Sequence, residues 1–279
     1  MKVSKQCYPC LTELLYQAAE LATADPALRA KAIEQGMLLL EQEFSPDKVS
    51  VTIATPIHRL VRSITENDDP YFRMKDAEMR MALALRQEWQ SETGMDLKNA
   101  LMLAVRGNTI DFFKDIGEIR EEMSQSVIFA VDDTEKLEKS LHKARSILYL
   151  ADNSGEALFD IPLVSLLNEY ADTTYVVKGS PIQNDITLAE LQRYDLIKEF
   201  KHIITTGTDT PGVIMELASD EFLKAYDAAD VILAKGMGYW ETQSELPAEG
   251  KVFHLLKAKC QPVADSLNVA LNDYIALLR

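Results

Sequence analysis

Two short polar segments carry the side chains best suited to chemistry. Asp152-Asn153 follows an apolar run, and Asp185 stands in a second polar segment further along the chain. Carboxylate and amide oxygens suit Mg²⁺, Mn²⁺ and similar divalent ions, so these three residues predict a one-cation site with positions open for water or substrate. Lys178 and Lys235 follow two other apolar runs and would bring positive charge to the same place.

A third polar segment begins at Gly207-Thr208, again after an apolar run. We expect its N–H groups to open a helix, where they and the helix dipole favour an anion. A cation site, a lysine and a helix N-terminus together are the parts that bind phosphate and transfer phosphoryl groups. Each segment taken singly also suits a turn or a helix cap, so the functional interpretation depends on their convergence.

Strand and helix patterns explain why these segments should converge. Short β-rich runs alternate with amphipathic ones in the second half of the chain, which is typical of a doubly wound, mainly parallel sheet. Ligands of such sheets bind beyond the carboxyl ends of the strands, where the polar segments lie. The predicted strands are Ser146–Ala151, Thr173–Val177, His202–Thr206, Asp230–Ala234 and Val252–Leu256, and the helical runs between them are Ala157–Tyr170, Thr187–Tyr194 and Val213–Ala218.

The first half of the chain has a helical period instead. Leu11, Leu14, Leu15 and Ala18 follow three- and four-residue spacing. We therefore predict a helical N-terminal domain over residues 1–125 and an α/β domain over residues 126–279.

Composition excludes several classes of protein. The 279 residues include 29 Lys and Arg against 44 Asp and Glu, a formal net charge of −15, which argues against nucleic acid and anionic membrane surfaces as partners. No apolar run approaches the roughly 20 residues that span a bilayer, and the N-terminus lacks the features of a secretory signal. We expect a cytoplasmic protein.

The same segments resemble the metal-dependent damage-control phosphatases, also catalogued as domain of unknown function 89. Order and spacing agree over almost the whole chain, and the N-terminal Cys-x-x-Cys resembles the archaeal and bacterial branch. The matching segments are Cys7–Cys10, Arg106–Asp111, Ala151–Glu156, Val177–Thr187, Thr206–Gly212 and Ala234–Thr242, followed by the tail Leu255–Ala264.

The resemblance implies a three-layer α/β/α sandwich with a helical N-terminal domain, and hydrolysis of small phosphorylated metabolites with Mg²⁺, Mn²⁺, Co²⁺ or Ni²⁺. It assigns the cation to Asp152, Asn153 and Asp185, and the substrate phosphate to Lys235. It also places Asn108 and Asp111 at the pocket and matches Glu241, whereas Tyr239 stands where the family usually has Asn. That departure bears on substrate choice.

Two reaction routes fit these residues. Water bound to the cation could attack phosphorus, assisted by a carboxylate, or an aspartate such as Asp185 could form a phosphoenzyme. Glu156 is a candidate base or supporting residue, and Asp160, one turn further on, is expected to be a surface or capping residue. The alternative function is a non-catalytic protein that binds a metal or a phosphorylated metabolite.

Two groups of residues have less certain roles in the sequence. Cys7, Cys10 and Cys260 could form a second metal site only if folding brings them together; a packing role is the alternative. His58, Arg59 and Arg62 share one helical face, which is expected to be solvated; a wall of the pocket is the alternative.

Overall fold

One mixed sheet organises the molecule. A computed structural model describes residues 1–88, 95–110, 116–247 and 249–279. Within them, seven strands form a sheet in the order β1-β7-β6-β5-β2-β3-β4. The strands are β1 Phe129–Asp132, β2 Ser146–Leu150, β3 Asp172–Val177, β4 His202–Thr205, β5 Val231–Lys235, β6 Val252–Lys257 and β7 Tyr274–Leu278.

Five strands, from β6 across to β4, run parallel, and β7 is antiparallel to β6. These five are the strands predicted from the sequence, and no end moves by more than one residue. The strands β1 and β7, which lie together at one end of the sheet, were not predicted from the sequence.

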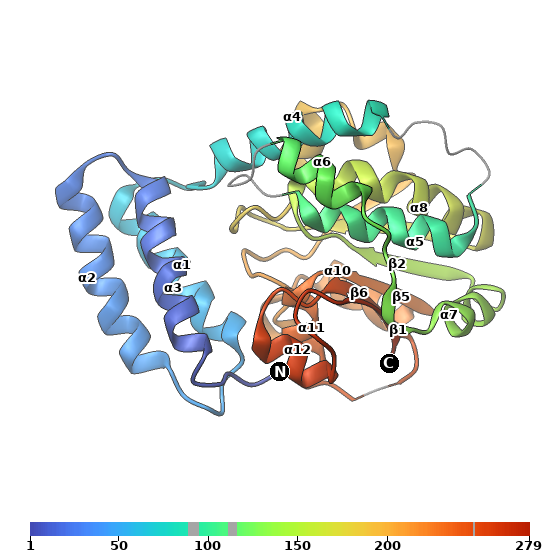
Figure 1. Ribbon diagram of the computed structural model, residues 1–279. Coiled ribbons are helices and arrows are strands. Elements are labelled where there is room, and N and C mark those ends of the chain that lie inside the picture. The colour runs from blue at the N-terminus through green and yellow to red at the C-terminus, as the bar shows by residue number, and fades with distance from the viewer. Residues whose placement is uncertain (89–94, 111–115, 248) are drawn as a thin grey trace.

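Helices cover both faces of the sheet, so the expected three-layer sandwich is confirmed. Figure 1 shows α4, α5, α6 and α8 over one face, and α10, α11 and α12 on the other. The helices are α1 Cys7–Ala22, α2 Pro26–Glu43, α3 Ser50–Thr65, α4 Phe72–Glu88, α5 Leu97–Arg106, α6 Ile116–Ser124, α7 Thr134–Leu141, α8 Ala157–Tyr170, α9 Leu188–Arg193, α10 Asp220–Ala228, α11 Met237–Gln243 and α12 Gln261–Leu267. None of these helices is long and apolar enough to cross a membrane.

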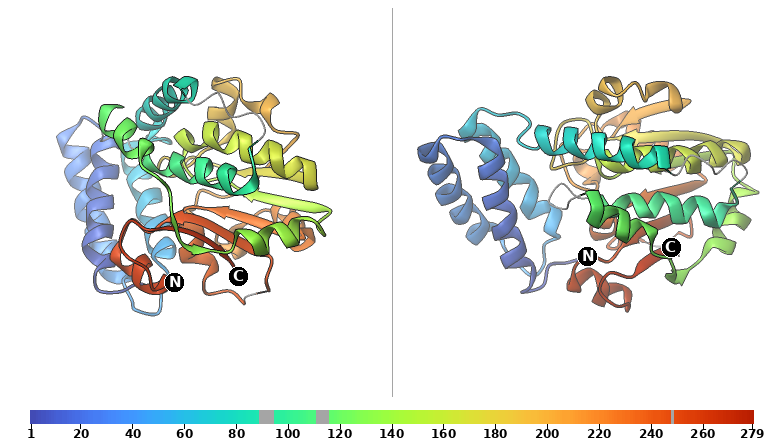
Figure 2. Two further views of the ribbon diagram at one scale, coloured as in Figure 1. Left: turned by 45° about the vertical axis from the view of Figure 1, so that its right-hand side comes forward. Right: turned by 45° about the horizontal axis from the view of Figure 1, so that its top comes forward.

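The apolar residues separate into two main regions. Helices α1 to α3 form a bundle with its own core, around Leu15, Leu40 and Ile53, and both views of Figure 2 show it beside the sheet. A larger core joins the sheet to α4, α5 and α8, and it reaches back along the chain to Met79.

This division differs from the boundary predicted between residues 125 and 126. The bundle core ends near Met74, because α4 and α5 turn their apolar faces to the sheet layer rather than to the bundle. Periodicity shows that a segment is helical and which face is apolar. It does not show which layer that face covers.

Candidate active site

The candidate site lies where the strand order reverses. The chain passes from β2 outward to β3 and β4, then returns to the other side of β2 as β5 and β6. Open α/β sheets bind ligands at this switch point, beyond the carboxyl ends of the strands. Asp152 follows β2 and Gly236 follows β5, so both stand at that position.

Gly236 shows how closely these two strand ends approach. Its φ of +81° lies in the left-handed region, and a Cβ on it would come within 1.9 Å of Asp152 Oδ2. A side chain at Gly236 would therefore displace the carboxylate, and the glycine leaves the room that Asp152 occupies.

The predicted cation ligands share one small cavity. Asn153 and Asp185 face each other through an isolated antiparallel bridge, and Ile186 N donates to Asp152 O at 2.9 Å. The cavity has a volume of about 130 Å³. It is lined by Asn108, Asp152, Asn153, Gln183, Asp185, Pro211, Gly212, Met237, Gly238 and Lys259.

Neighbouring cations and hydrogen bonds only partly balance the negative charge of the carboxylates in the cavity. Burial raises the pKa of Asp152 well above its usual value, and the charges of Glu156 and Asp185 raise it further. Burial also raises the pKa of Asp185 to about 6, although Lys178 opposes the shift. Asp185 Oδ2 is buried and accepts no hydrogen bond, with Lys178 Nζ at 3.3 Å. A cation beside these oxygens would relieve both the repulsion and the unmet acceptor.

The donor set is suited to an open cation site. Two carboxylates and one amide are hard oxygen donors, and water or substrate would complete the coordination. In the described ranges, no group of three or more His, Cys, Asp or Glu side chains is arranged to hold a metal ion. The candidate set reaches three only by counting the amide of Asn153.

Glu156 organises the back of the cavity. Its carboxylate accepts hydrogen bonds from Asn153 Nδ2 at 2.8 Å and from Asn108 Nδ2, and Lys235 Nζ lies 2.7 Å away. Asn108, which lines the cavity as expected, also donates to Asp152 Oδ2 at 3.4 Å. Glu156 thus fixes two amides that border the candidate ligands.

Lys235 does not face the cavity, contrary to its predicted contact with phosphate. An ammonium has three N–H donors, and here they meet Glu156, Asp160 Oδ1 at 2.8 Å and Ala104 O at 3.0 Å. Burial lowers the pKa of Lys235, but the two carboxylates outweigh it and raise the pKa. Asp160 is likewise no surface residue: it is fully buried and also accepts from the hydroxyls of Tyr149 and Tyr175.

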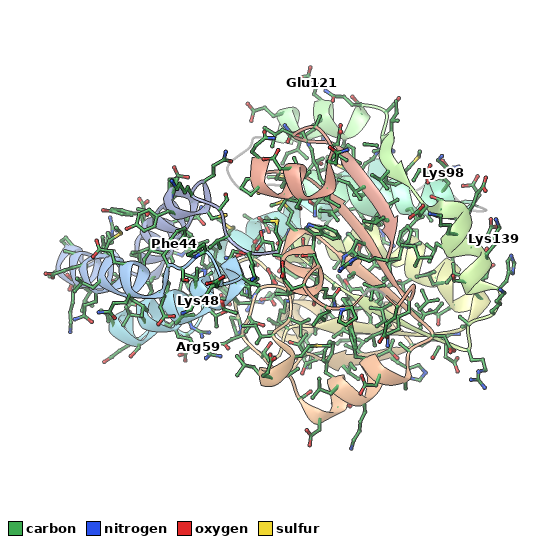
Figure 3. All side chains as sticks on the ribbon, turned by 90° about the horizontal axis from the view of Figure 1, so that it is seen from below. Phe44, Lys48, Arg59, Lys98, Glu121 and Lys139 are labelled. Atoms are coloured by element: carbon green, nitrogen blue, oxygen red, sulfur yellow. The ribbon has the colours of Figure 1, made fainter. Side chains whose placement is uncertain are left out.

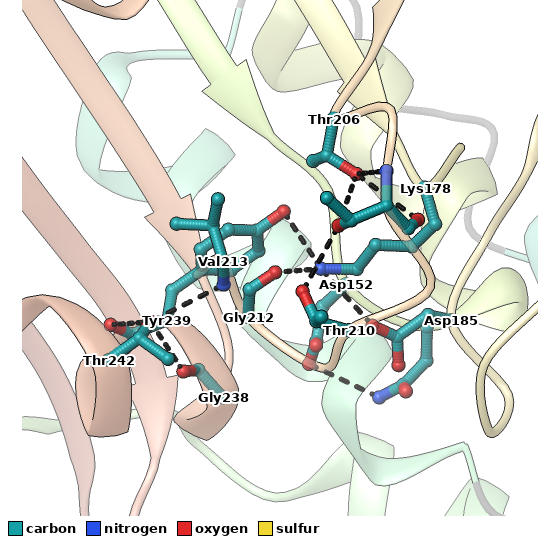
Figure 4. A network of polar contacts seen from close by, with 12 residues as sticks. Asp152, Lys178, Asp185, Thr206, Thr210, Gly212, Val213, Gly238, Tyr239 and Thr242 are labelled. Atoms are coloured by element: carbon teal, nitrogen blue, oxygen red, sulfur yellow. Dashed lines mark hydrogen bonds and ion pairs between the residues drawn. The ribbon is translucent and has the colours of Figure 1, made fainter. Parts of the chain in front are cut away.

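Lys178 belongs to a different network, which Figure 4 shows together with Asp152 and Asp185. Its ammonium donates to Gly212 O and to Tyr239 Oη, the latter at 3.1 Å, and it lies next to Asp185. The ring of Tyr239 is also within reach, with its centroid 4.3 Å from Lys178 Nζ. Tyr239 therefore supplies both a hydroxyl and an aromatic face to the lysine beside a candidate cation ligand.

The segment after β4 corrects another prediction. No helix begins at Gly207-Thr208, and the helical run expected at Val213–Ala218 contains only the short 3₁₀ turn Met215–Leu217. Instead, Gly207 N–H donates to the hydroxyl of Thr205, and Thr208 N–H donates to the hydroxyl of Thr206. Local threonine hydroxyls thus satisfy the groups that a helix N-terminus would have offered to an anion.

The face of α3 expected to be solvated instead joins the bundle to the site loops. Arg59 and Arg62 both pair with Asp209, and they hold its pKa at about 2 despite the burial of that carboxyl. Arg62 also donates to Pro181 O at 2.8 Å, and buried His58 contacts Gln183. Figure 3 shows Arg59 where the bundle meets the α/β part.

Lys259 is the cavity cation that sequence reasoning did not single out. It is exposed, lines the cavity and lowers the pKa of Asp152 in opposition to burial. A signal was available, because Lys259 closely follows β6, whose carboxyl end lies at the same edge as those of β2 and β5. Applying the strand-end rule to every parallel strand would have found it.

The other predicted site residues lie apart from this cavity or outside the described ranges. Asp111 is one of the residues that the structure does not describe. Glu241 accepts a hydrogen bond from Ser50 Oγ in a neighbouring cavity, and burial raises its pKa.

The three cysteines line that neighbouring cavity as free thiols. Burial raises the pKa of Cys10, and raises that of Cys260 to about 11. Folding therefore brings Cys7, Cys10 and Cys260 to one place. The three-thiol metal site itself stays a prediction, since among the described residues no such trio is arranged to hold a metal.

The fold and the cavity together define an α/β protein with a polar site at the switch point of its sheet. The chain belongs to the family of the damage-control phosphatase ARMT1-like domain, whose model matches residues 3–275. This confirms the family resemblance found in the sequence motifs.

Individual relatives agree with that assignment. A protein of Pyrococcus horikoshii named damage-control phosphatase is 34% identical over 276 residues, covering 96% of this chain and 95% of the relative. One of Archaeoglobus fulgidus with the same name is 32% identical and covers 99% of each chain. The crystal structure of a DUF89 family protein from Pyrococcus horikoshii superposes with a TM-score of 0.91 at 32% identity, over 100% of this chain and 99% of that one.

Proposed function

We propose that this protein is a divalent-cation-dependent phosphatase that hydrolyses small phosphate monoesters. The observation that carries the proposal is the cavity in which Asp152, Asn153 and Asp185 meet, with Lys259 at its wall. Two relatives are named damage-control phosphatases, which supports the same reaction. Mg²⁺, Mn²⁺, Co²⁺ and Ni²⁺ all remain candidates.

The side chains divide the work in this proposal. Asp152, Asn153 and Asp185 would hold the cation, which when bound polarises a phosphoryl oxygen and lowers the pKa of a water. Lys259 would meet the remaining negative charge of the phosphate, in the place first assigned to Lys235. The exposed ammonium of Lys259 is suited to this, because Lys235 has already engaged its donors.

An attacking water needs a nearby carboxylate oxygen that can accept its proton. Glu156 accepts from two amides and a lysine, so it orients Asn108 and Asn153 rather than accepting a further proton. Asp185 lines the cavity and keeps acceptor capacity beside its ion pair with Lys178, so we assign it as the base for an attacking water in addition to its role at the cation. A phosphoenzyme formed on Asp185 is the alternative route.

Turnover of 4-nitrophenyl phosphate tests the proposal. The protein should be active with at least one of the four cations and inactive after chelation. Asp152→Ala should reduce kcat/KM by about 100-fold or more, the loss typical of removing one group that supports transition-state charge. Asp227→Ala, which changes an exposed aspartate on α10, is the matched control and should leave kcat/KM unchanged.

Three outcomes would count against parts of this scheme. Activity that survives in folded Asp152→Ala would show that the site is misplaced. A phosphoenzyme trapped in a single turnover would replace the water route. Inorganic phosphate binding without turnover, across a panel of phosphorylated metabolites and cations, would favour the alternative of a non-catalytic binding protein.

A further inference from the structure

A second, apolar cavity adjoins the polar one. It has a volume of about 260 Å³, and α1 and α3 of the bundle form one of its walls. The bundle contributes Leu11, Leu14, Val51 and Ala54, and the α/β part contributes Met237 and Pro262. We call this space the apolar cavity.

The two cavities are neighbours that share part of their walls. Gln183, Pro211, Met237 and Gly238 line both of them. The polar cavity, at about 130 Å³, suits a small anion, and the apolar cavity is about twice as large at 260 Å³. Taken together they fall within the roughly 300–1,000 Å³ typical of small-molecule sites, which the polar cavity alone does not reach.

The walls of the apolar cavity limit what can occupy it. Apolar side chains predominate, and the charged groups are the carboxylate of Glu241, bonded to Ser50, and the N-terminal ammonium of Met1, which is already paired with Glu245 and the main-chain oxygen of Glu241. An anionic group there would lose its hydration and face a second negative charge. An uncharged ring or aliphatic chain would instead gain from burial against Leu14 and Met237.

The contacts of α3 keep this wall in place. Arg62 bonds both Asp209 and Pro181 O, so α3 is fastened to two loops of the site. Pro181 stands two residues before Gln183, which lines both cavities. The bundle therefore shapes the substrate site without supplying a candidate cation ligand.

We propose that the apolar cavity binds the alcohol part of the phosphate monoester, and that the protein selects substrates whose leaving group is largely apolar and carries no second anion. This inference rests on the proposed phosphatase function and names its substrate class. Leu14 of the bundle is then a specificity-determining residue.

Three aryl phosphates with similar phenolic leaving groups test the proposal. KM should fall from phenyl phosphate to 1-naphthyl phosphate, because the second ring adds buried apolar area, and should rise for 4-carboxyphenyl phosphate. Leu14→Trp partly fills the cavity, so it should raise KM for 1-naphthyl phosphate by about tenfold, within the range reported for small changes in apolar pockets. The inhibition constant of inorganic phosphate should not change, since phosphate needs only the polar cavity.

Leu38→Trp is the matched control, because Leu38 lies on α2 of the same bundle and is 55% exposed. If Leu14→Trp fails to fold, Leu14→Ala should still raise KM for 1-naphthyl phosphate more than for phenyl phosphate. Equal KM values for the three esters, with turnover intact, would overturn this inference and leave the phosphatase function standing. Absence of turnover with every ester and cation would overturn the function itself.

Discussion

Two buried lysines flank the carboxyl end of β2, and they differ in almost everything except position. Lys235 ends β5 and Lys178 follows β3, the two strands that neighbour β2. The ammonium of Lys235 is enclosed by two carboxylates and a carbonyl. The ammonium of Lys178 meets a carbonyl, the hydroxyl of Tyr239 and, at 3.3 Å, the carboxylate of Asp185.

The difference in partners gives Lys235 a structural role and places Lys178 next to a candidate cation ligand. Lys235 pairs with Glu156 and Asp160, neither of which lines the polar cavity, and it has only a minor lowering effect on the pKa of Asp152. Lys178 acts on Asp185, a candidate cation ligand, and opposes the rise of its pKa. A lysine at a strand end can thus stabilise the walls of a site or shift the pKa of its ligands, depending on which carboxylates it pairs with.

The largest effect on stability is expected from Lys235→Met. The substitution leaves Glu156 and Asp160 buried without their cation, and breaking a buried ion pair in this way costs about 3–5 kcal/mol. The free energy of unfolding from urea denaturation measures it. Lys98→Met is the control, because the Lys98–Asp132 pair is exposed and such pairs contribute about 0–1 kcal/mol.

A second variant tests the stated cause of that loss. Adding Asp160→Asn to Lys235→Met removes one of the two uncompensated charges, so it should restore part of the lost stability. If Lys235→Met costs no more than Lys98→Met, the distinction between the two lysines is wrong. If the double variant is less stable than Lys235→Met, the loss has another origin than buried charge.

The sequence predicted the parallel strands well because their signal is local. Near-continuous apolar runs bounded by polar segments mark buried strands, and the segments that follow them come together at one edge by topology alone. Asp152, Asn153 and Asp185 could therefore be placed in one cavity without coordinates. The pairing of β1 and β7 and the packing partner of α4 depend on contacts between distant segments, which periodicity does not report.

Side-chain direction is the other information that the sequence lacked. Lys235 and Asp160 satisfy each other's charge in the interior, although one was expected at the phosphate and the other at the surface. Arg59 and Arg62 form ion pairs across 150 and 147 residues of chain. Composition records that these charges exist. Only the fold shows which of them are neighbours.

Lys178→Met should impair catalysis more than stability, the opposite of what we expect for Lys235→Met. We expect a smaller loss of stability, about 1–3 kcal/mol, because Lys178 pairs with one carboxylate, which lines the cavity, whereas Lys235 holds two in the interior. The loss in kcat/KM should be about 10- to 100-fold, as for residues that orient metal ligands. Kinetics with varied cation concentration check this, because a weakened cation affinity is the signature of an effect through Asp185. An unchanged cation dependence would place Lys178 with the scaffold.

The smallest effect is expected from Tyr239→Phe, which isolates one contact of the second lysine. The ring remains beside Lys178, and only the hydroxyl that accepts at 3.1 Å is lost, so stability should fall by about 0.5–1.5 kcal/mol. Tyr16→Phe, at a tyrosine 49% exposed on α1, is the control and should change nothing. In the Lys178→Met background the hydroxyl has no ammonium to meet, so the effect of Tyr239→Phe should largely disappear there. Additive effects of the two substitutions would mean that Tyr239 acts on the site independently of Lys178.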